Sequence, residues 1–447
     1  MKKILFISPS YRSKLLEKLR VLAIPPLSLT TLAAHTPEEY EVQIVDEAVE
    51  DIDFGVHADL VAITCMTPLA PRAYDIAARF RERGVPVVLG GIHVSMMPDE
   101  AARYADAIVI GEAERLWPAL LTDFSKGALK AVYRDSSPPD IENLPKPRRE
   151  LLTGDYFVHT MQTSRGCPHN CNFCSVTLFN GGRSRLRNMD KVVEEAREIK
   201  GKRFFIIDDN IIGSGTKSFD RTFDLFARLK DIGKEWAGQT CLNIVEQDGL
   251  LAAASKSGAR VFLIGFESIV PEALASMGKS VNLRPNTRNF KEAVKKIHDH
   301  GIAIVGGFMF GTDHDTKDCF DATAEFILDA GIDAVQLSIQ TPLPGTALYK
   351  RLAEEKRLLY TDYPRDWERY NIFEPVFRPK QMTPDELYDG LIRSYRNVSS
   401  FTSSVKRGVR TFVNTRSLFS TGISFFWNYD SYKTIKGTTG AAISRGA

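Results

Sequence analysis

The sequence lacks the features that mark membrane, secreted or nucleic-acid-binding proteins. Its 58 Lys and Arg residues nearly balance its 56 Asp and Glu residues, so no global charge excess indicates nucleic acid as a partner. No uninterrupted apolar run approaches the roughly 20 residues that a helix needs to cross a bilayer. The first apolar run, residues 4–7, ends at a Ser-Pro break and is too short for a signal peptide. These absences predict a cytoplasmic protein.

Cysteine is also scarce: the chain has six, and three of them share one short loop. Cys167, Cys171 and Cys174 are spaced C-x3-C-x2-C. Three thiolates can hold three corners of a cubane 4Fe–4S cluster, which normally takes four, so one iron stays open for a small ligand. Zinc sites usually add a second cysteine pair or histidines, and only His159 and His169 lie nearby. Since disulfides have little support in an intracellular chain, the spacing favours an iron–sulfur cluster.

The first 134 residues alternate short apolar runs with helical patterns. Runs at 4–7, 42–45, 60–63, 85–89 and 107–110 predict five buried parallel strands, with helices over 28–34, 70–84, 99–105 and 113–124. This alternation predicts a doubly wound, Rossmann-like α/β domain that binds ligands at the carboxyl ends of its strands. The candidate binding residues at those ends are Thr64, Thr67, Gly90, Gly91, His93, Gly111 and Glu112. A lone histidine beside two glycines is, however, more often structural.

The rest of the chain divides into three parts. Residues 135–155 are rich in proline and charge, which predicts an extended linker. Residues 156–345 predict an incomplete (β/α)6 barrel, with strands at 158–163, 203–207, 237–242, 260–264, 303–308 and 334–339. The chemistry of such barrels sits on the loops after the strands, and the cysteine loop follows the first strand. Residues 346–447 predict a mainly helical C-terminal extension.

Taken together, these parts resemble the cobalamin (B12)-binding-domain radical S-adenosylmethionine (SAM) proteins, and in particular the class B radical SAM methyltransferases. The segments 59–64, 87–93 and 110–114 resemble the B12-binding half, and 163–167 and 264–268 resemble the SAM-binding half. Segments 308–311 and 340–346 resemble a subgroup with a distinctive C-terminal extension. One departure is clear: where methionine-synthase-like B12 domains carry Asp-x-His-x-x-Gly, this chain reads Ser8-Pro-Ser-Tyr-Arg12, so no lower histidine ligand for cobalt is available.

The resemblance implies three cofactors: a 4Fe–4S cluster, SAM and cobalamin. It also implies an external one-electron donor such as flavodoxin or ferredoxin, and a small substrate of apolar character that is methylated at an unactivated carbon. The candidate SAM-binding residues are Asp208, Asp209, Asn210, Glu267, Ser268 and Arg185. For each of them, a solvated loop charge is the alternative interpretation.

Several alternatives stay open at this point. The same cofactors could serve ring formation or rearrangement without methyl transfer, or the chain could be a non-catalytic iron–sulfur or corrinoid sensor. Cys65, Cys241 and Cys319 are isolated, which argues against a second cluster and sulfur insertion. Cys241 could donate a hydrogen atom to a radical or pack as a small hydrophobe. The basic and aromatic tail from residue 404 could touch a membrane surface or form a helix packed against the barrel.

Overall fold

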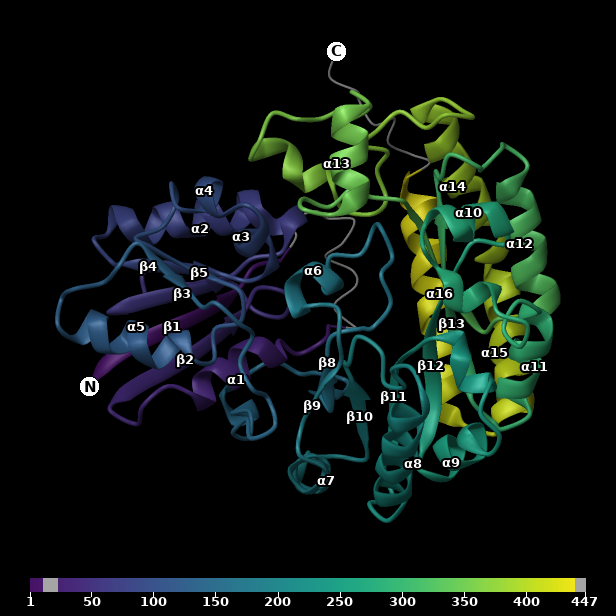
Figure 1. Cartoon of the computed structure of the whole chain (residues 1–447), viewed down its shortest axis with the longest axis horizontal. Coiled ribbons are helices and arrows are strands. Elements are labelled where there is room, and N and C mark those ends of the chain that lie inside the picture. The colour runs from purple at the N-terminus through teal and green to yellow at the C-terminus, as the bar shows by residue number, and fades with distance from the viewer. Residues whose placement is uncertain (11–22, 439–447) are drawn as a thin grey trace.

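The computed structural model describes residues 1–10 and 23–438, and these ranges build two parallel sheets with flanking helices (Figure 1). The amino-terminal sheet and the barrel sheet form separate halves of the molecule, and the two carboxyl-terminal helices, coloured yellow, lie on the barrel half. The predicted fold class is confirmed: a doubly wound sheet, an incomplete barrel and a helical extension.

The described part of the amino-terminal half contains a six-stranded parallel sheet of order β2-β1-β3-β4-β5-β6. Its strands are β1 (Lys2–Ser8), β2 (Tyr40–Asp46), β3 (Leu60–Thr64), β4 (Val87–Gly90), β5 (Ala107–Ile110) and β6 (Val132–Arg134). Its helices are α1 (Leu27–Ala34), η2 (Thr67–Leu69), α2 (Ala70–Glu82), α3 (Ile92–Met96), α4 (Pro98–Ala101) and α5 (Leu116–Ser125). Both faces are buried, so the inner strands read as continuous apolar runs.

Two details of this half differ from the prediction. The sheet gains β6, a short edge strand that buries only Tyr133 and therefore gives no apolar run in the sequence. The helix predicted over 99–105 is replaced by two short helices, α3 and α4. The second begins at Pro98, which lacks the N–H that would continue the preceding helix.

The barrel half contains a second six-stranded parallel sheet, again counted over the described residues, of order β14-β13-β12-β11-β10-β7. Its strands are β7 (His159–Met161), β10 (Arg203–Ile206), β11 (Glu235–Thr240), β12 (Ala259–Glu267), β13 (Ala303–Phe310) and β14 (Ala334–Ile339). The short strands β8 (Ser164–Arg165) and β9 (Arg185–Leu186) pair antiparallel beside it. The barrel's helices are α6 (Val176–Asn180), α7 (Met189–Glu198), α8 (Thr216–Lys230), η4 (Leu242–Val245), α9 (Leu250–Lys256), α10 (Pro271–Ser276), η5 (Ser280–Leu283), α11 (Phe290–His298) and α12 (Cys319–Ala330).

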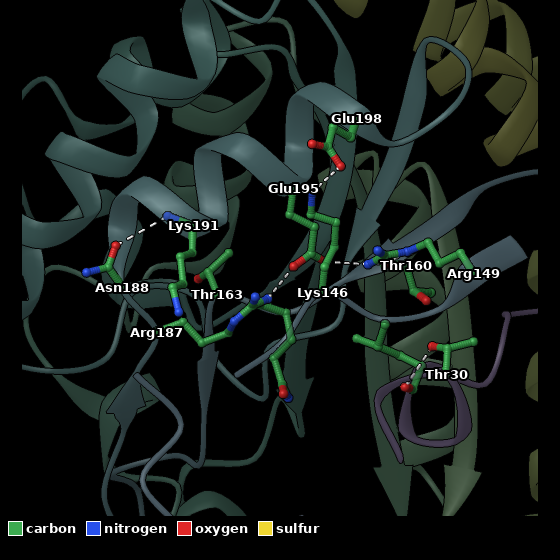
Figure 2. Close-up of polar contacts among 12 residues, drawn as sticks. Thr30, Lys146, Arg149, Thr160, Thr163, Arg187, Asn188, Lys191, Glu195 and Glu198 are labelled. Atoms are coloured by element: carbon green, nitrogen blue, oxygen red, sulfur yellow. Dashed lines mark hydrogen bonds and ion pairs between the residues drawn. The ribbon is translucent and has the colours of Figure 1, made fainter. Parts of the chain in front are cut away.

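The segment 135–155 is fastened to both halves. Within it, η3 (Arg149–Leu151) places Arg149 so that it donates to the carbonyl of Thr160 at 2.6 Å and pairs with Glu195 of α7. Glu195 also forms an ion pair with Arg187 at 2.7 Å, so two arginines converge on one buried carboxylate (Figure 2). Leu151 packs against the core of the amino-terminal sheet. This segment therefore holds the halves together.

The extension returns to both halves. It comprises α13 (Ala347–Glu354), η6 (Arg365–Arg369), α14 (Pro384–Val398), α15 (Phe401–Thr415) and α16 (Leu418–Thr438). Trp367 of η6 joins the core of the amino-terminal sheet, whereas Phe419 of α16 packs on the barrel strands against Val261 and Val305. Over residues 1–10 and 23–438, no helix has the length and apolar character needed to cross a bilayer.

Candidate functional site

The cysteine loop lies between β8 and α6, at the carboxyl edge of the barrel sheet. Asp208, directly after β10, accepts hydrogen bonds from the backbone N–H of Thr163 at 2.6 Å and from the hydroxyls of Thr163 and Ser164 at 2.5 and 2.7 Å. Asp209 accepts from the N–H of Gly166 at 2.7 Å. In this structure the two carboxylates thus fix the backbone leading into Cys167, which differs from the predicted direct contact with SAM.

The far side of the loop is held by α10 and α13. The N–H of Asn172 donates to the carbonyl of Met277 at 3.0 Å, and the N–H of Leu348 donates to the carbonyl of Asn172 at 3.0 Å. A Cβ at Gly278 would lie 2.9 Å from the carbonyl oxygen of Asn170, so only glycine fits there. The loop is therefore supported by three separate elements, which is what an ordered ligand set requires.

Of the three thiol-bearing residues, Cys171 is buried, and Cys167 and Cys174 are half-buried. Burial raises the pKa of Cys167 and of Cys171 to about 11, and it raises the pKa of Cys174 as well. The nearby ammonium of Lys279 opposes this shift at all three sulfurs. A ligand set that binds as thiolate must lose these protons when a metal group binds.

Lys279 is the cation that sequence reasoning missed. It lies just after α10, is buried, and its Nζ is 2.8 Å from Oε1 of Glu267. Burial lowers the pKa of Lys279, but the charges of Glu267, Cys241 and Cys171 outweigh it and raise the pKa above the ordinary value. A single lysine after a glycine carried no pattern in the sequence, because the fold alone brings it to the thiols.

Glu267 itself adopts a strained backbone conformation. Its φ is 65°, where non-glycine residues are rare, and the register of β12 against β13 shifts at this point. A Cβ at Gly265 would lie 2.2 Å from Oε1 of Glu267, so glycine lets the side chain fold back over the strand. Strain of this kind is concentrated at functional sites. Ser268, its predicted partner, instead accepts the N–H of Val270 at 3.0 Å ahead of α10.

Two further predicted residues lie around the thiols. Cys241 follows β11, is buried, and is close enough to Cys171 and Lys279 for their charges to influence its pKa. Asn210 is buried, and its Nδ2 has no hydrogen-bond partner among the described residues. An unsatisfied buried donor indicates a missing ligand or water.

The sulfur donors suit a cluster better than a single ion. No group of three or more His, Cys, Asp or Glu side chains in ranges 1–10 and 23–438 is arranged around one metal-ion position. A cubane differs in that each thiolate binds its own iron. Three thiols on one braced loop, with a buried cation beside them, fit such a group.

At the amino-terminal sheet, the glycine turns are tightly built. Gly91 has a φ of 100°, and a Cβ there would lie 2.8 Å from the backbone of Cys65. Gly111 has a φ of 87° with open space around it, and its N–H is fixed by Ser95 Oγ at 2.8 Å. The space at Gly111 allows a ligand to approach the backbone. Thr64 and Gly90 lie beside these turns on paired strands.

The predicted binding residue His93 lies at a buried hydrogen-bonded junction. It is fully buried, its Nε2 lies 3.2 Å from Oε1 of Glu100, and its Nδ1 lies 3.3 Å from Oγ1 of Thr67. Glu100 also accepts Tyr74 at 2.9 Å and the indole N–H of Trp367 at 3.1 Å. Both ring nitrogens are therefore engaged in a junction between the sheet and the extension.

Arg185 and Glu112 also have roles other than the predicted ones. The Arg185 guanidinium pairs with Glu112 and donates to the carbonyl of Pro139 at 2.9 Å, whereas its buried Nε has no hydrogen-bond partner among the described residues. Arg165, two residues before Cys167, pairs with Glu112 and, at 2.7 Å, with Glu114. These buried pairs clamp the loop after β5 to the strand that precedes the cysteines. Arg165 lies beside the cysteine motif in the sequence, but no local pattern predicts that it pairs with Glu112.

Comparisons with known proteins agree with this architecture. Residues 161–327 match the radical SAM superfamily, and residues 20–121 match the B12 binding domain. The chain is 31% identical to bacteriochlorophyllide d C-12(1)-methyltransferase of Chlorobaculum tepidum, over 91% of this chain and 89% of that one. It is 30% identical to the C-8(2)-methyltransferase of the same organism, over 89% and 90%. The fold is similar to the radical SAM methyltransferase TsrM from Kitasatospora setae, with a TM-score of 0.67, 15% identity, and coverage of 98% and 100%.

Proposed function

Since this chain belongs to the radical SAM family whose members carry an N-terminal B12-binding domain, we propose that it methylates an unactivated carbon of a small, largely apolar substrate held inside the barrel. The chain is an enzyme of the cobalamin-dependent radical SAM methyltransferase class, and its cofactors are a 4Fe–4S cluster, SAM and cobalamin. The resemblance, the enzyme class and the cofactors predicted from the sequence are thereby confirmed, and the sensor interpretation is excluded.

The observation that carries the proposal is the thiol loop, held by three elements, beside a face of the barrel sheet on which Gln239 is exposed. Val261 and Val305 face α16, so by the two-residue period of a strand the positions above them on the same face are Gly265 and Gly307. On β11 the corresponding residue, Gln239, is exposed in the middle of the sheet. An exposed side chain on an otherwise covered sheet marks space on that face, next to Glu267 and Lys279.

The same positions support a neutral substrate. The interior residues above α16 are uncharged: Ile207, Gln239, Gly265, Gly307 and Gln336. The two amides can pair with carbonyl or hydroxyl groups, while the glycines leave room for an apolar body. The two relatives named for methylation at C-12(1) and C-8(2) of bacteriochlorophyllide d support a carbon as the acceptor.

When bound, the cluster and SAM supply a 5′-deoxyadenosyl radical, and cobalamin supplies the methyl group. The chain's own part is to hold the cofactors in place and to exclude water. Cys167, Cys171 and Cys174 would hold the cluster, while the Lys279 ammonium and the strained Glu267 carboxylate offer opposite charges for the amino acid end of SAM. Gly111 leaves backbone open at the sheet edge where cobalamin would lie, and Gly91 lets the neighbouring turn pack against Cys65.

An enzyme of this class needs an external one-electron donor and acts on a small molecule. We take flavodoxin or ferredoxin as the donor for this chain. We propose these residues as the cofactor-binding residues of the chain. We also propose that its domains span residues 1–134, 135–155, 156–345 and 346–447.

The test uses the full chain, reconstituted without oxygen with iron, sulfide and hydroxocobalamin, then supplied with SAM and reduced flavodoxin. Neutral candidate substrates are added one at a time. The proposal expects 5′-deoxyadenosine, S-adenosylhomocysteine and a methylated product in matching amounts. Deoxyadenosine and a converted substrate without S-adenosylhomocysteine would replace methyl transfer by ring formation or rearrangement. Turnover of charged substrates only would contradict the neutral interior.

A further inference from the structure

Helix α15 buries polar and small residues and exposes apolar ones, which is the reverse of an ordinary surface helix. Its buried residues are polar or small: Ser404, Arg407, Gly408 and Thr411. Its outward stripe is apolar and recurs at helical spacing: Phe401, Val405, Val409, Phe412 and Val413. These five side chains are between 39% and 60% exposed. A soluble surface helix places its apolar residues inward, so the outer face of α15 is suited to an apolar phase.

The polar contacts of the buried face fix this orientation. Thr411 donates to Oδ1 of Asp333 at 2.6 Å, and Arg407 donates to the carbonyl of Val398. The other carboxylate oxygen of Asp333 accepts the N–H of Ile304 and contacts His298, both at 2.8 Å. Rolling the helix to bury its valines would break the bonds from Thr411 to Asp333 and from Arg407 to Val398, which is costly. The apolar stripe is therefore held outward.

The charge on the segment that carries the stripe has one sign, although Asp329 of the neighbouring α12 lies close enough to Arg410 to interact with its charge. Residues 390–429 contain no Asp or Glu but six cations: Arg393, Arg396, Lys406, Arg407, Arg410 and Arg416. Lys406, Arg410 and Arg416 are exposed on α15 or at its carboxyl end. Leu418, the first residue of α16, is 76% exposed and extends the apolar character beyond α15. Apolar stripes bordered by Lys and Arg are the signature of helices that lie in a membrane interface.

We propose that α15 docks this chain on a lipid bilayer that carries anionic headgroups, with Val409 and Val413 entering the headgroup boundary. The helix lies parallel to the surface, since none of the described helices can span a bilayer. A second copy of the chain is the poorer occupant, because it would bring two cationic surfaces together. The inference is independent of the proposed reaction and extends beyond it.

The docking face lies away from the thiols. Arg407 and Thr411 contact Ile332 and Asp333, which directly precede β14, and Thr415 lies beside Gly301, ahead of β13. These contacts place α15 at the amino edge of the barrel sheet, whereas the cysteine loop lies at the carboxyl edge. Membrane contact therefore leaves the catalytic edge uncovered.

The experiment is co-sedimentation of the full-length chain with vesicles of phosphatidylcholine alone or mixed with phosphatidylglycerol. Binding is expected for the anionic vesicles and should weaken as salt is raised. The double variant Val409→Glu, Val413→Glu should lose at least about ten-fold in partitioning, since both side chains leave the apolar phase. Lys406→Gln should lose about five-fold. Val132→Glu on β6, an equally exposed valine outside α15, should bind as the wild type does.

Reductive SAM cleavage in vesicle-free solution reports the fold of each variant, and it should be unchanged. Equal binding to neutral and anionic vesicles, or full binding by the double variant, would overturn the proposal. So would light scattering that shows a dimer lost in the double variant, because the stripe would then be a contact between copies.

Discussion

The carboxyl edges of the two parallel sheets use their charged residues differently. At the barrel edge, Glu267 and Lys279 pair with each other and stay beside the thiols. At the amino-terminal edge, Glu112 and Glu100 are turned toward other parts of the chain, one to Arg165 and one to Trp367. A polar residue after a strand is the same signal in both sheets. Whether it becomes a binding group depends on whether another element covers that edge.

The largest expected effect separates the two edges. Cys171→Ala removes the most buried of the three thiols, so after anaerobic reconstitution the iron content should fall to background and reductive SAM cleavage should stop. Cobalamin absorbance on the same variant should be unchanged, because the B12 edge does not depend on this loop. Cys319→Ala, at a buried cysteine of α12, serves as the control and should keep its iron. Iron retained by Cys171→Ala would break the cluster assignment.

The next largest expected effect is a loss of stability when the ion pairs of Glu112 with Arg165 and Arg185 are broken. Glu112→Ala leaves Arg185 with only a carbonyl partner and Arg165 with Glu114 and the amide oxygen of Gln162. Removing one member of a buried ion pair leaves the other charge buried without that partner. The free energy of unfolding should therefore fall by about 3 kcal/mol. Urea titration measures it. Asp224→Ala, which breaks an exposed pair with Arg228, should change stability by about 1 kcal/mol at most. Equal effects would mean that the clamp contributes little.

The sequence predicts local features of the two sheets well and contacts between distant segments poorly. Strand periodicity predicted five of six strands in one sheet and all six in the other, because buried parallel strands read as apolar runs. The C-x3-C-x2-C spacing located the thiols, since all three ligands lie in one loop. Lys279, by contrast, is more than a hundred residues from Cys167, and the partners of Glu112 lie in a different domain. Contacts of that kind depend on how the halves meet, which no local pattern encodes.

The junction at His93 offers a smaller and more selective effect. His93→Ala removes a hydrogen bond to the buried Glu100 and leaves a cavity beside Tyr74, so stability should fall by about 2 kcal/mol. His93→Gln, which can still donate to Glu100, should recover part of that loss. Cobalamin titration of both folded variants should give wild-type affinity. If affinity fell sharply while stability held, His93 would be a cofactor contact and the contrast between the two edges would fail.

The smallest effect is the pH dependence at Asp208. Burial raises the pKa of this carboxyl above its ordinary value of 3.8, although the hydrogen bonds from Thr163 and Ser164 lower it. The folded chain therefore binds the proton more tightly than the unfolded chain, so this group stabilises the fold increasingly as pH falls toward 3.8. Asp208→Asn has no such proton. The stability difference, wild type minus variant, should grow toward acid pH, by at most about 1.4 kcal/mol per pH unit.

Urea titrations of the wild type and Asp208→Asn across a pH series measure this difference. Ser164→Ala is the matched control, because it removes one hydroxyl donor and keeps the carboxylate, so its own pH dependence should persist and extend to higher pH. A constant difference, or one that grows toward alkaline pH, would mean that Asp208 is better stabilised as an anion than its burial allows. The residue would then resemble a carboxylate kept charged for a ligand. It would serve ligand binding in addition to fixing the backbone that leads into Cys167.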